Sequence, residues 1–221
     1  MSEIKINKIS INSEIPITYH HLNAGDDKPL LVFFHGYSDS ARGILRRAFP
    51  DLDSKYEILA INGLFPVPQK KDDGWKQAFA WYFADFSKNS ILIHPEISAK
   101  AVIHLIEQLG LQERKKVLIG FSQGGFFIPF VLPFLKNVVH LFGIGAAYRE
   151  EDYSEKLSIP FEALHGTDDE VIPCDLSEKT FRKFIEKKNP EGKFHRFAGL
   201  KHTMNDESRL WLKKRIDEVL G

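Results

Sequence analysis

Lys116-Val-Leu-Ile-Gly-Phe-Ser-Gln-Gly-Gly-Phe-Phe-Ile128 is the stretch of the sequence that decides the fold. An apolar strand runs into a glycine-rich turn and then into a segment compatible with a helix. Gly120, Ser122 and Gly124 have G-x-S-x-G spacing, in which the chain reverses so sharply that the serine is strained and its neighbours two residues away must be very small. The serine hydroxyl then stands at a helix N-terminus, which favours developing negative charge. We therefore predict that Ser122 is a nucleophile; the alternative is a turn whose serine only caps the next helix.

Similar short apolar runs recur along the chain and are typical of strands covered on both faces. They lie at Leu30–Phe34, Ile58–Ile61, Val138–Ile144 and Pro160–Leu164, with Phe194–Phe197 as a weaker candidate. Two half-buried strands, Ile4–Ile11 and Ile15–Leu22, flank a tight turn near the N-terminus and predict an antiparallel edge.

Segments with helical spacing separate these strands. Pro95–Leu109 carries an apolar stripe and Gly110 is placed to end it, while Leu212 and Ile216 belong to a comparable stripe near the C-terminus. Strands that alternate with helices predict an α/β fold with a mostly parallel sheet and helices on both faces. A length of 221 residues suits one domain over 1–221.

The composition excludes several classes of function. Lys plus Arg and Asp plus Glu both number 30, so no net charge points to nucleic acid or to an anionic membrane. No apolar run reaches the ~20 residues of a membrane span, and no signal peptide precedes the domain, so we expect a cytoplasmic protein without stable membrane insertion. The single Cys174 leaves no disulfide or thiolate set, and His20 and His21 point to opposite faces of a strand, so we expect no metal and no cofactor.

A serine nucleophile needs a base, and in chains with this turn the acid and then the histidine follow the serine. Four histidines follow Ser122. His140 lies inside an apolar strand, His195 lies within a candidate strand, and His165 ends a strand before an acidic loop. His202 opens the final helical segment from a loop tip, so we predict that it is the base.

The acid is expected in the stretch Phe161-Glu-Ala-Leu-His-Gly-Thr-Asp-Asp-Glu-Val-Ile-Pro173. A strand ends there and a loop carries Asp168, Asp169 and Glu170 side by side, at the strand end where parallel sheets build their sites. Composition alone does not choose among the three carboxylates.

Two backbone N–H groups are expected to form an oxyanion hole. One belongs to Gln123, directly after the predicted nucleophile, and the other to Tyr37, in the loop that follows the first buried strand. Gly36 permits the close turn that this loop requires.

With these pieces placed, the sequence resembles the phospholipase/carboxylesterase family of α/β-hydrolases, which includes acyl-protein thioesterases and small bacterial carboxylesterases. The resemblance spans about Pro29 to Leu212. It rests on Phe34-His-Gly-Tyr37, Gly120-Phe-Ser-Gln-Gly-Gly125, His165-Gly-x-x-Asp-x-Val-Ile-Pro173 and Lys201-His202. The family pattern implies an α/β-hydrolase fold, and it implies Asp169 as the acid, with Asp168 as the fallback. A chain of 221 residues leaves no room for a large lid domain.

Two departures bear on substrate preference. The family's Gly-x-Gly-His approach to the histidine is Gly199-Leu-Lys-His202 here, and its His-Gly-Leu-Gly-Asp loop is His35-Gly-Tyr-Ser-Asp39. The segment Asn62–Asn89 is dense in aromatic residues and, by the resemblance, approaches the site. We predict that an acyl-binding groove is lined by Phe65, Trp75, Trp81 and Phe83; simple core packing is the alternative.

These expectations favour a hydrolase of carboxylic esters or thioesters that acts on a small-molecule or acylated substrate, as a monomer or homodimer. A lysophospholipase or a small peptidase would use the same machinery. A catalytically inert binding protein that keeps the fold is the alternative of another class.

Overall fold

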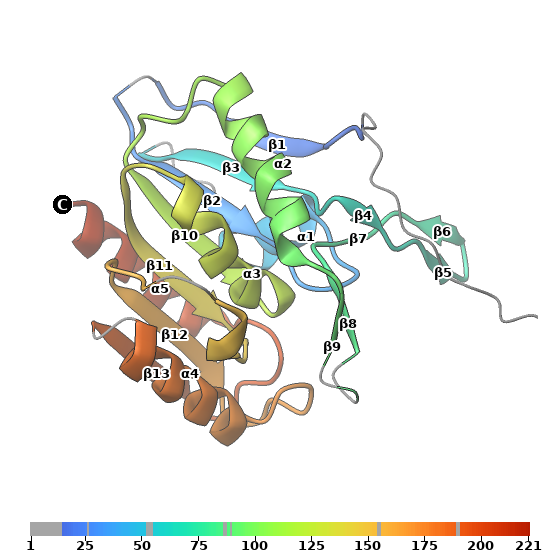
Figure 1. The fold of residues 1–221 in the computed structure, drawn as a ribbon, viewed down its shortest axis with the longest axis vertical. Coiled ribbons are helices and arrows are strands. Elements are labelled where there is room, and N and C mark those ends of the chain that lie inside the picture. Colours follow the sequence, from blue (N-terminus) through green and yellow to red (C-terminus); the bar gives the residue numbers. More distant parts are fainter. Residues whose placement is uncertain are drawn as a thin grey trace, which may run out of the picture.

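A seven-stranded sheet forms the centre of the molecule (Figure 1). The computed structural model describes residues 15–25, 27–51, 55–85, 88, 90–153, 156–188 and 191–221. The sheet has the order β1 (Tyr19–Leu22), β3 (Glu57–Ile61), β2 (Leu30–Phe34), β10 (Lys116–Phe121), β11 (Val138–Ile144), β12 (Phe161–Gly166) and β13 (Gly192–Phe197). All neighbours are parallel except β1 and β3, which confirms the predicted mostly parallel sheet with an antiparallel edge.

The antiparallel edge is shorter than expected. The predicted strand Ile15–Leu22 begins only at Tyr19, although the Thr18 carbonyl still accepts the Asn62 N–H. Further toward Ile15, Pro16 has no N–H to give to a ladder. Within the described chain β1 pairs with β3, with Tyr19 opposite Ile61. The other predicted edge strand, Ile4–Ile11, lies outside the described residues.

Helices cover both faces of the sheet, as predicted. On one face lie α1 (Ala41–Ala48) and α5 (Asp206–Leu220); on the other lie α2 (Pro95–Gln108), α3 (Gln123–Val131) and α4 (Cys174–Lys188), with short 3₁₀ turns η2 (Leu132–Phe134) and η3 (Glu150–Asp152). Successive side chains of β2 point to opposite faces of the sheet. Leu31 and Phe33 pack with α1 and α5. Leu30, Val32 and Phe34 pack with α2 and α3. Gly110, at φ +70, follows the end of α2 as expected.

The aromatic segment after β3 is not an irregular loop. It folds into three small two-stranded sheets, β4 (Phe65–Pro66) with β7 (Phe79–Ala80), β5 (Gln69–Lys71) with β6 (Gly74–Lys76), and β8 (Phe83–Asp85) with β9 (Ser90–Ile93). Figure 1 shows these ribbons projecting beyond one end of the main sheet. The described chain contains no helix that is both long and apolar enough to cross a membrane.

The strand order places a functional site between β2 and β10. From β2 the chain first adds β3 on one side and later adds β10 on the other. Ligands of open parallel sheets bind at such a reversal, beyond the carboxyl ends of the strands. The loop after β2 and the turn after β10 therefore meet at one edge.

Candidate active site

Ser122 stands at the carboxyl end of β10, in the strained backbone that its motif predicts. Its φ is 52° and its ψ −115°, in the region that L-residues seldom occupy, and its side chain makes no cap with α3. The backbone around it allows nothing larger than glycine. A Cβ on Gly120 would lie 2.4 Å from the Gly124 carbonyl, and a Cβ on Gly124 would lie 2.1 Å from the Phe34 carbonyl oxygen. Both glycines are therefore required by close approach of backbone.

His202 and Asp169 form a hydrogen-bonded pair. His202 Nδ1 lies 2.7 Å from Asp169 Oδ2, and the Asp169 side chain is 1% exposed while that of His202 is 18% exposed. Asp168, the alternative acid, is exposed and accepts a hydrogen bond from the Thr167 hydroxyl. Of the two adjacent carboxylates, which composition alone could not distinguish, the one that bonds His202 is that of Asp169.

Four donors hold the Asp169 carboxylate. Oδ1 accepts the backbone N–H groups of Val171 and Ile172, each at 2.9 Å. Besides His202, Oδ2 lies 3.2 Å from His165 Nε2, which also donates to the Ile172 carbonyl at 2.8 Å. Burial lowers the pKa of His165, so its ring is neutral and carries its proton on Nε2. These contacts fix the position of the buried carboxylate and direct Oδ2 at the Nδ1 of His202.

The His202 ring lies beside the serine turn. Its centroid is 4.9 Å from the ring of Phe121, the residue before Ser122. Its Nδ1 and Cε1 lie 3.4 Å from where a Cβ on Gly145 would stand, and the carbonyl just before Gly145 accepts the N–H of Ser122 at 2.7 Å. Within the described residues the Ser122 hydroxyl makes no hydrogen bond. In enzymes without bound substrate, the hydrogen bond between the nucleophile and its base is often long and shortens only when substrate binds.

The loop after β2, which carries the predicted donor Tyr37, contacts the serine turn. A Cβ on Gly36 would lie 3.3 Å from Ser122 Cβ, so this loop and the serine turn are in contact. In the described part of the chain, the N–H groups of Tyr37 and Gln123 donate to no protein acceptor, which leaves both free for an oxyanion.

His35 fixes the orientation of the Gly36–Tyr37 peptide. Its Nε2 accepts the Gly63 N–H at 2.8 Å, so the proton is on Nδ1, which donates to the Gly36 carbonyl at 2.6 Å. In a trans peptide the N–H points opposite to the carbonyl, so the Tyr37 N–H points away from the His35 ring. Burial lowers the pKa of His35 to about 4, outweighing the opposing effect of the Gly36 hydrogen bond, and keeps the ring neutral.

Trp81 and the Gln123 side chain connect the two sides of the predicted oxyanion hole. Gln123 Oε1 accepts the Trp81 N–H and Gln123 Nε2 donates to the Tyr82 carbonyl, both at 2.9 Å. Trp81 Nε1 donates to the His35 carbonyl at 2.8 Å. Sequence reasoning missed these supporting roles of His35, Trp81 and Gln123, because each bond joins segments that lie far apart in the sequence.

The four predicted groove residues occupy different places. Phe83 contacts both Tyr37 and Phe65 edge to face, with ring centroids 6.3 Å and 5.8 Å apart. Tyr37 is 55% exposed, so these three rings form a partly open aromatic shelf beside the oxyanion loop. Trp81 is 1% exposed and stacks on a core phenylalanine, and Trp75 is 72% exposed on the separate β5–β6 ribbon.

The other two histidines that follow Ser122, His140 and His195, have a structural partner. His140 and His195 contact Glu162 at 3.1 Å and 2.7 Å, and Arg215 donates to the same carboxylate at 2.6 Å. Burial alone would raise the pKa of Glu162, but these donors lower it below the ordinary range. The described residues contain no cluster of three or more metal-ligating side chains. Cys174 is buried and free, as expected of a small filler.

Comparison with known proteins gives a consistent picture. The model of the phospholipase/carboxylesterase family matches residues 21–219. An acyl-protein thioesterase 1 homolog from Dictyostelium discoideum is 25% identical over 198 residues, which cover 80% of this chain and 86% of that protein. An esterase from Anopheles gambiae is 25% identical over 218 residues, covering 88% and 82%.

Solved structures share the fold at lower identity. Acyl-protein thioesterase 2 from Zea mays superposes with a TM-score of 0.70 at 16% identity, covering 92% of this chain and 99% of that one. A carboxylesterase from Mesorhizobium loti gives 0.61 at 15% identity, covering 91% and 94%. At these identities the superpositions support the fold alone.

Proposed function

Since the chain belongs to the phospholipase/carboxylesterase family, whose members are hydrolases, we propose that it cleaves carboxylic esters and thioesters through an acyl-enzyme on Ser122. The observation that carries this proposal is the buried Asp169–His202 hydrogen bond, whose histidine packs on the residue next to Ser122.

Acylation begins when Ser122 Oγ attacks the substrate carbonyl and its proton passes to His202 Nε2. Asp169 stays ionised and holds Nδ1–H, which keeps the other ring nitrogen free to accept that proton. The oxyanion accepts hydrogen bonds from the N–H groups of Tyr37 and Gln123, each worth about 2.7–4 kcal/mol in the transition state. Collapse expels the alcohol or thiol, which takes its proton from His202.

Deacylation repeats these steps with water. His202 Nε2 takes a proton from the attacking water, the oxyanion forms again in the same hole, and Ser122 leaves with the proton returned by His202. The carboxylic acid is released and the free enzyme is restored. No metal or cofactor enters the scheme.

We propose that the acyl group of the substrate is apolar and binds against the aromatic shelf of Tyr37, Phe65 and Phe83, next to the oxyanion loop. The free, buried Cys174 is compatible with a reducing compartment, and we extend the proposal to a cytoplasmic location.

The experiment is turnover of p-nitrophenyl butyrate together with labelling by a fluorophosphonate probe. Wild-type protein should show an acylation burst and be labelled at Ser122. Ser122→Ala should lose both, with turnover lower by about 10⁴-fold or more, because the nucleophile is absent. Ser158→Ala, at an exposed serine, is the matched control and should behave as wild type. Normal turnover in Ser122→Ala would refute the proposal.

A further inference from the structure

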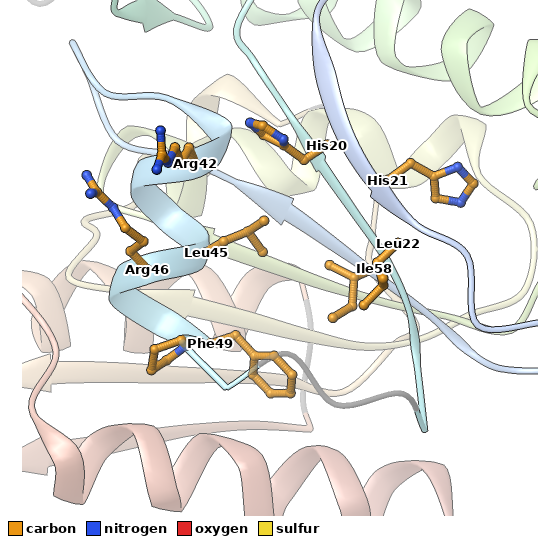
Figure 2. A pocket seen from close by; sticks show the side chains of 9 residues that line it. His20, His21, Leu22, Arg42, Leu45, Arg46, Phe49 and Ile58 are labelled. Carbon is orange, nitrogen blue, oxygen red and sulfur yellow. The ribbon is translucent and has the colours of Figure 1, made fainter.

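A surface pocket of ≈ 350 Å³ lies away from Ser122, between α1 and the edge strands β1 and β3. Its floor is apolar: Leu45 of α1 and Ile58 of β3 face each other across the hollow, with Phe49 and Leu22 beside them (Figure 2). The volume is at the lower end of the range for small-molecule sites. None of the residues placed in the candidate active site lines it.

Two arginine side chains and one histidine side chain line the pocket beside this apolar floor. Arg42 and Arg46 project from α1, and His20 points from β1 toward α1, whereas its neighbour His21 points the other way (Figure 2). His21 is engaged with Glu57 at 2.7 Å. The pocket therefore pairs an apolar interior with a rim of hydrogen-bond donors, and both guanidinium groups carry positive charge.

Arg42 and Arg46 are unusual among the arginines of this protein. The sequence has nine arginines. Ion pairs with carboxylates engage Arg47, Arg114, Arg149, Arg182, Arg196, Arg209 and Arg215. In the part of the chain that the structure describes, Arg42 and Arg46 have no such partner, and both line the same pocket. Their neighbour Arg47, on the same helix, pairs with Asp39 at 2.6 Å.

The position of Arg42 is unfavourable for the helix itself. It stands in the first turn of α1, which contains no acidic residue, so its charge faces the positive end of the helix dipole. Arg42 and Arg46 are also four residues apart, a spacing at which like charges destabilise a helix. An anion between the two guanidinium groups would relieve both penalties.

We propose that this pocket binds one molecule of a single-chain amphiphile with an anionic head group. The ligand is the monomeric amphiphile, not a micelle or a membrane. The chain lies on Leu45, Phe49 and Ile58, and the head group lies between Arg42, Arg46 and His20. The orientation follows from charge: Asp51 is an exposed carboxylate just beyond the Phe49 end, so the anionic head lies at the Arg42 end. A concave site of this size holds one chain and does not present a flat surface to a bilayer.

The first test is titration calorimetry of the full chain with sodium decanoate, kept below its micelle concentration. Arg42→Gln/Arg46→Gln should weaken binding by tenfold or more, because charge-assisted hydrogen bonds to the head group are lost. The control is Lys100→Gln/Lys179→Gln, which removes the same charge from two exposed lysines elsewhere. Decanol, with no charge, should bind wild type at least tenfold more weakly than decanoate. Equal binding to wild type and to the Arg42/Arg46 double variant would overturn the proposal.

A charge reversal makes the test independent of stability. Arg42→Glu/Arg46→Glu should lose decanoate and gain affinity for decyltrimethylammonium, which has the same chain and the opposite head. Amide NMR shifts in wild type should be confined to α1, β1 and β3. Shifts confined to Ser122 and His202, or no binding of decanoate, would overturn the proposal. So would Arg42/Arg46-dependent binding to phosphatidylglycerol vesicles without binding of monomeric decanoate, since a membrane surface would then be the ligand.

Discussion

Two supports flank Ser122, and they are built differently. On one side a buried charge, Asp169, orients His202 through a 2.7 Å hydrogen bond. On the other side neutral groups orient the N–H groups of Tyr37 and Gln123, through the His35 ring and the Gln123 side chain. The acid side depends on the position of one carboxylate, whereas the oxyanion side depends on a network of backbone, imidazole, indole and amide groups.

The two supports also differ in how far they reach along the chain. Three of the four donors to Asp169 come from residues within four positions of it. The oxyanion side joins His35 to Gly63 over 28 positions, Trp81 to His35 over 46 and Trp81 to Gln123 over 42. Damage to the acid side should therefore remove catalysis sharply. Loss of one hydrogen bond on the oxyanion side should lower kcat less, because several other bonds still hold the two N–H donors in place.

The largest effect is expected for Asp169→Asn. An amide cannot both keep its donors satisfied and hold the Nδ1–H of His202, so kcat for p-nitrophenyl butyrate should fall by about 10⁴-fold. Asp168→Asn is the matched control, since this neighbour is exposed and its carboxylate accepts a hydrogen bond from the Thr167 hydroxyl. If the two variants were equally active, Asp169 would not be the orienting acid.

The acid side and the sheet could be predicted from the sequence because their signals are local. Continuous apolar runs gave strands covered on both faces, and the parallel order followed from their alternation with helices. The His165-to-Pro173 motif contains most of the Asp169 environment in nine consecutive residues. The edge strand is shorter than predicted, and Pro16 lacks the N–H that would extend its pairing toward Ile15.

The next effect is on stability, and it concerns His35. Burial lowers the pKa of His35 from 6.5 to about 4, so between these values the unfolded chain binds a proton that the folded chain excludes. The contribution of the neutral His35 ring to the free energy of unfolding is thus fully present above pH 6.5. It falls as the pH drops toward 4, by about 3 kcal/mol at 1.36 kcal/mol per pKa unit.

Urea unfolding of wild type and His35→Gln from pH 7 to pH 4 measures this contribution. The variant has no titrating group at this position, so the stability advantage of wild type should shrink by that amount on acidification. His20→Gln, at an exposed histidine, is the control and should leave the pH profile unchanged. Parallel profiles for wild type and His35→Gln would show that His35 does not resist protonation in the fold.

The oxyanion network could not be predicted from the sequence, since each bond joins segments that only the fold brings together. The aromatic segment was predicted to line an acyl-binding groove. In the structure it contributes to three small two-stranded sheets, and the Trp81 side chain is buried. Nothing in the sequence indicates that a glutamine next to the nucleophile binds the backbone of residues 81 and 82 with both ends of its amide.

A smaller effect is expected for Gln123→Leu. The side chain is similar in size, but the Trp81 N–H and the Tyr82 carbonyl lose their partners while the backbone N–H of residue 123 remains. We expect kcat to fall about tenfold with little change in KM, less than the 10²–10³-fold that follows loss of a whole donor. Affinity for a boronic acid transition-state analogue should fall in parallel. Gln108→Leu, on the exposed surface of α2, is the control; a rise in KM alone would contradict a role in positioning the donor.

The smallest effect is expected for Trp81→Phe, which separates packing from hydrogen bonding. Phenylalanine keeps a ring stacked on Phe127, where the centroids are 4.7 Å apart, but it removes the indole N–H from the His35 carbonyl. One buried carbonyl then lacks its donor, which costs about 1–3 kcal/mol of stability. Because the His35 ring still holds the Gly36 carbonyl, the Tyr37 N–H keeps its direction and kcat should fall only by about threefold. Trp75→Phe, at a 72% exposed ring, should change neither stability nor kcat. A loss in Trp81→Phe as large as that in Gln123→Leu would mean that Trp81, not the His35 ring, is the main support of the Tyr37 donor.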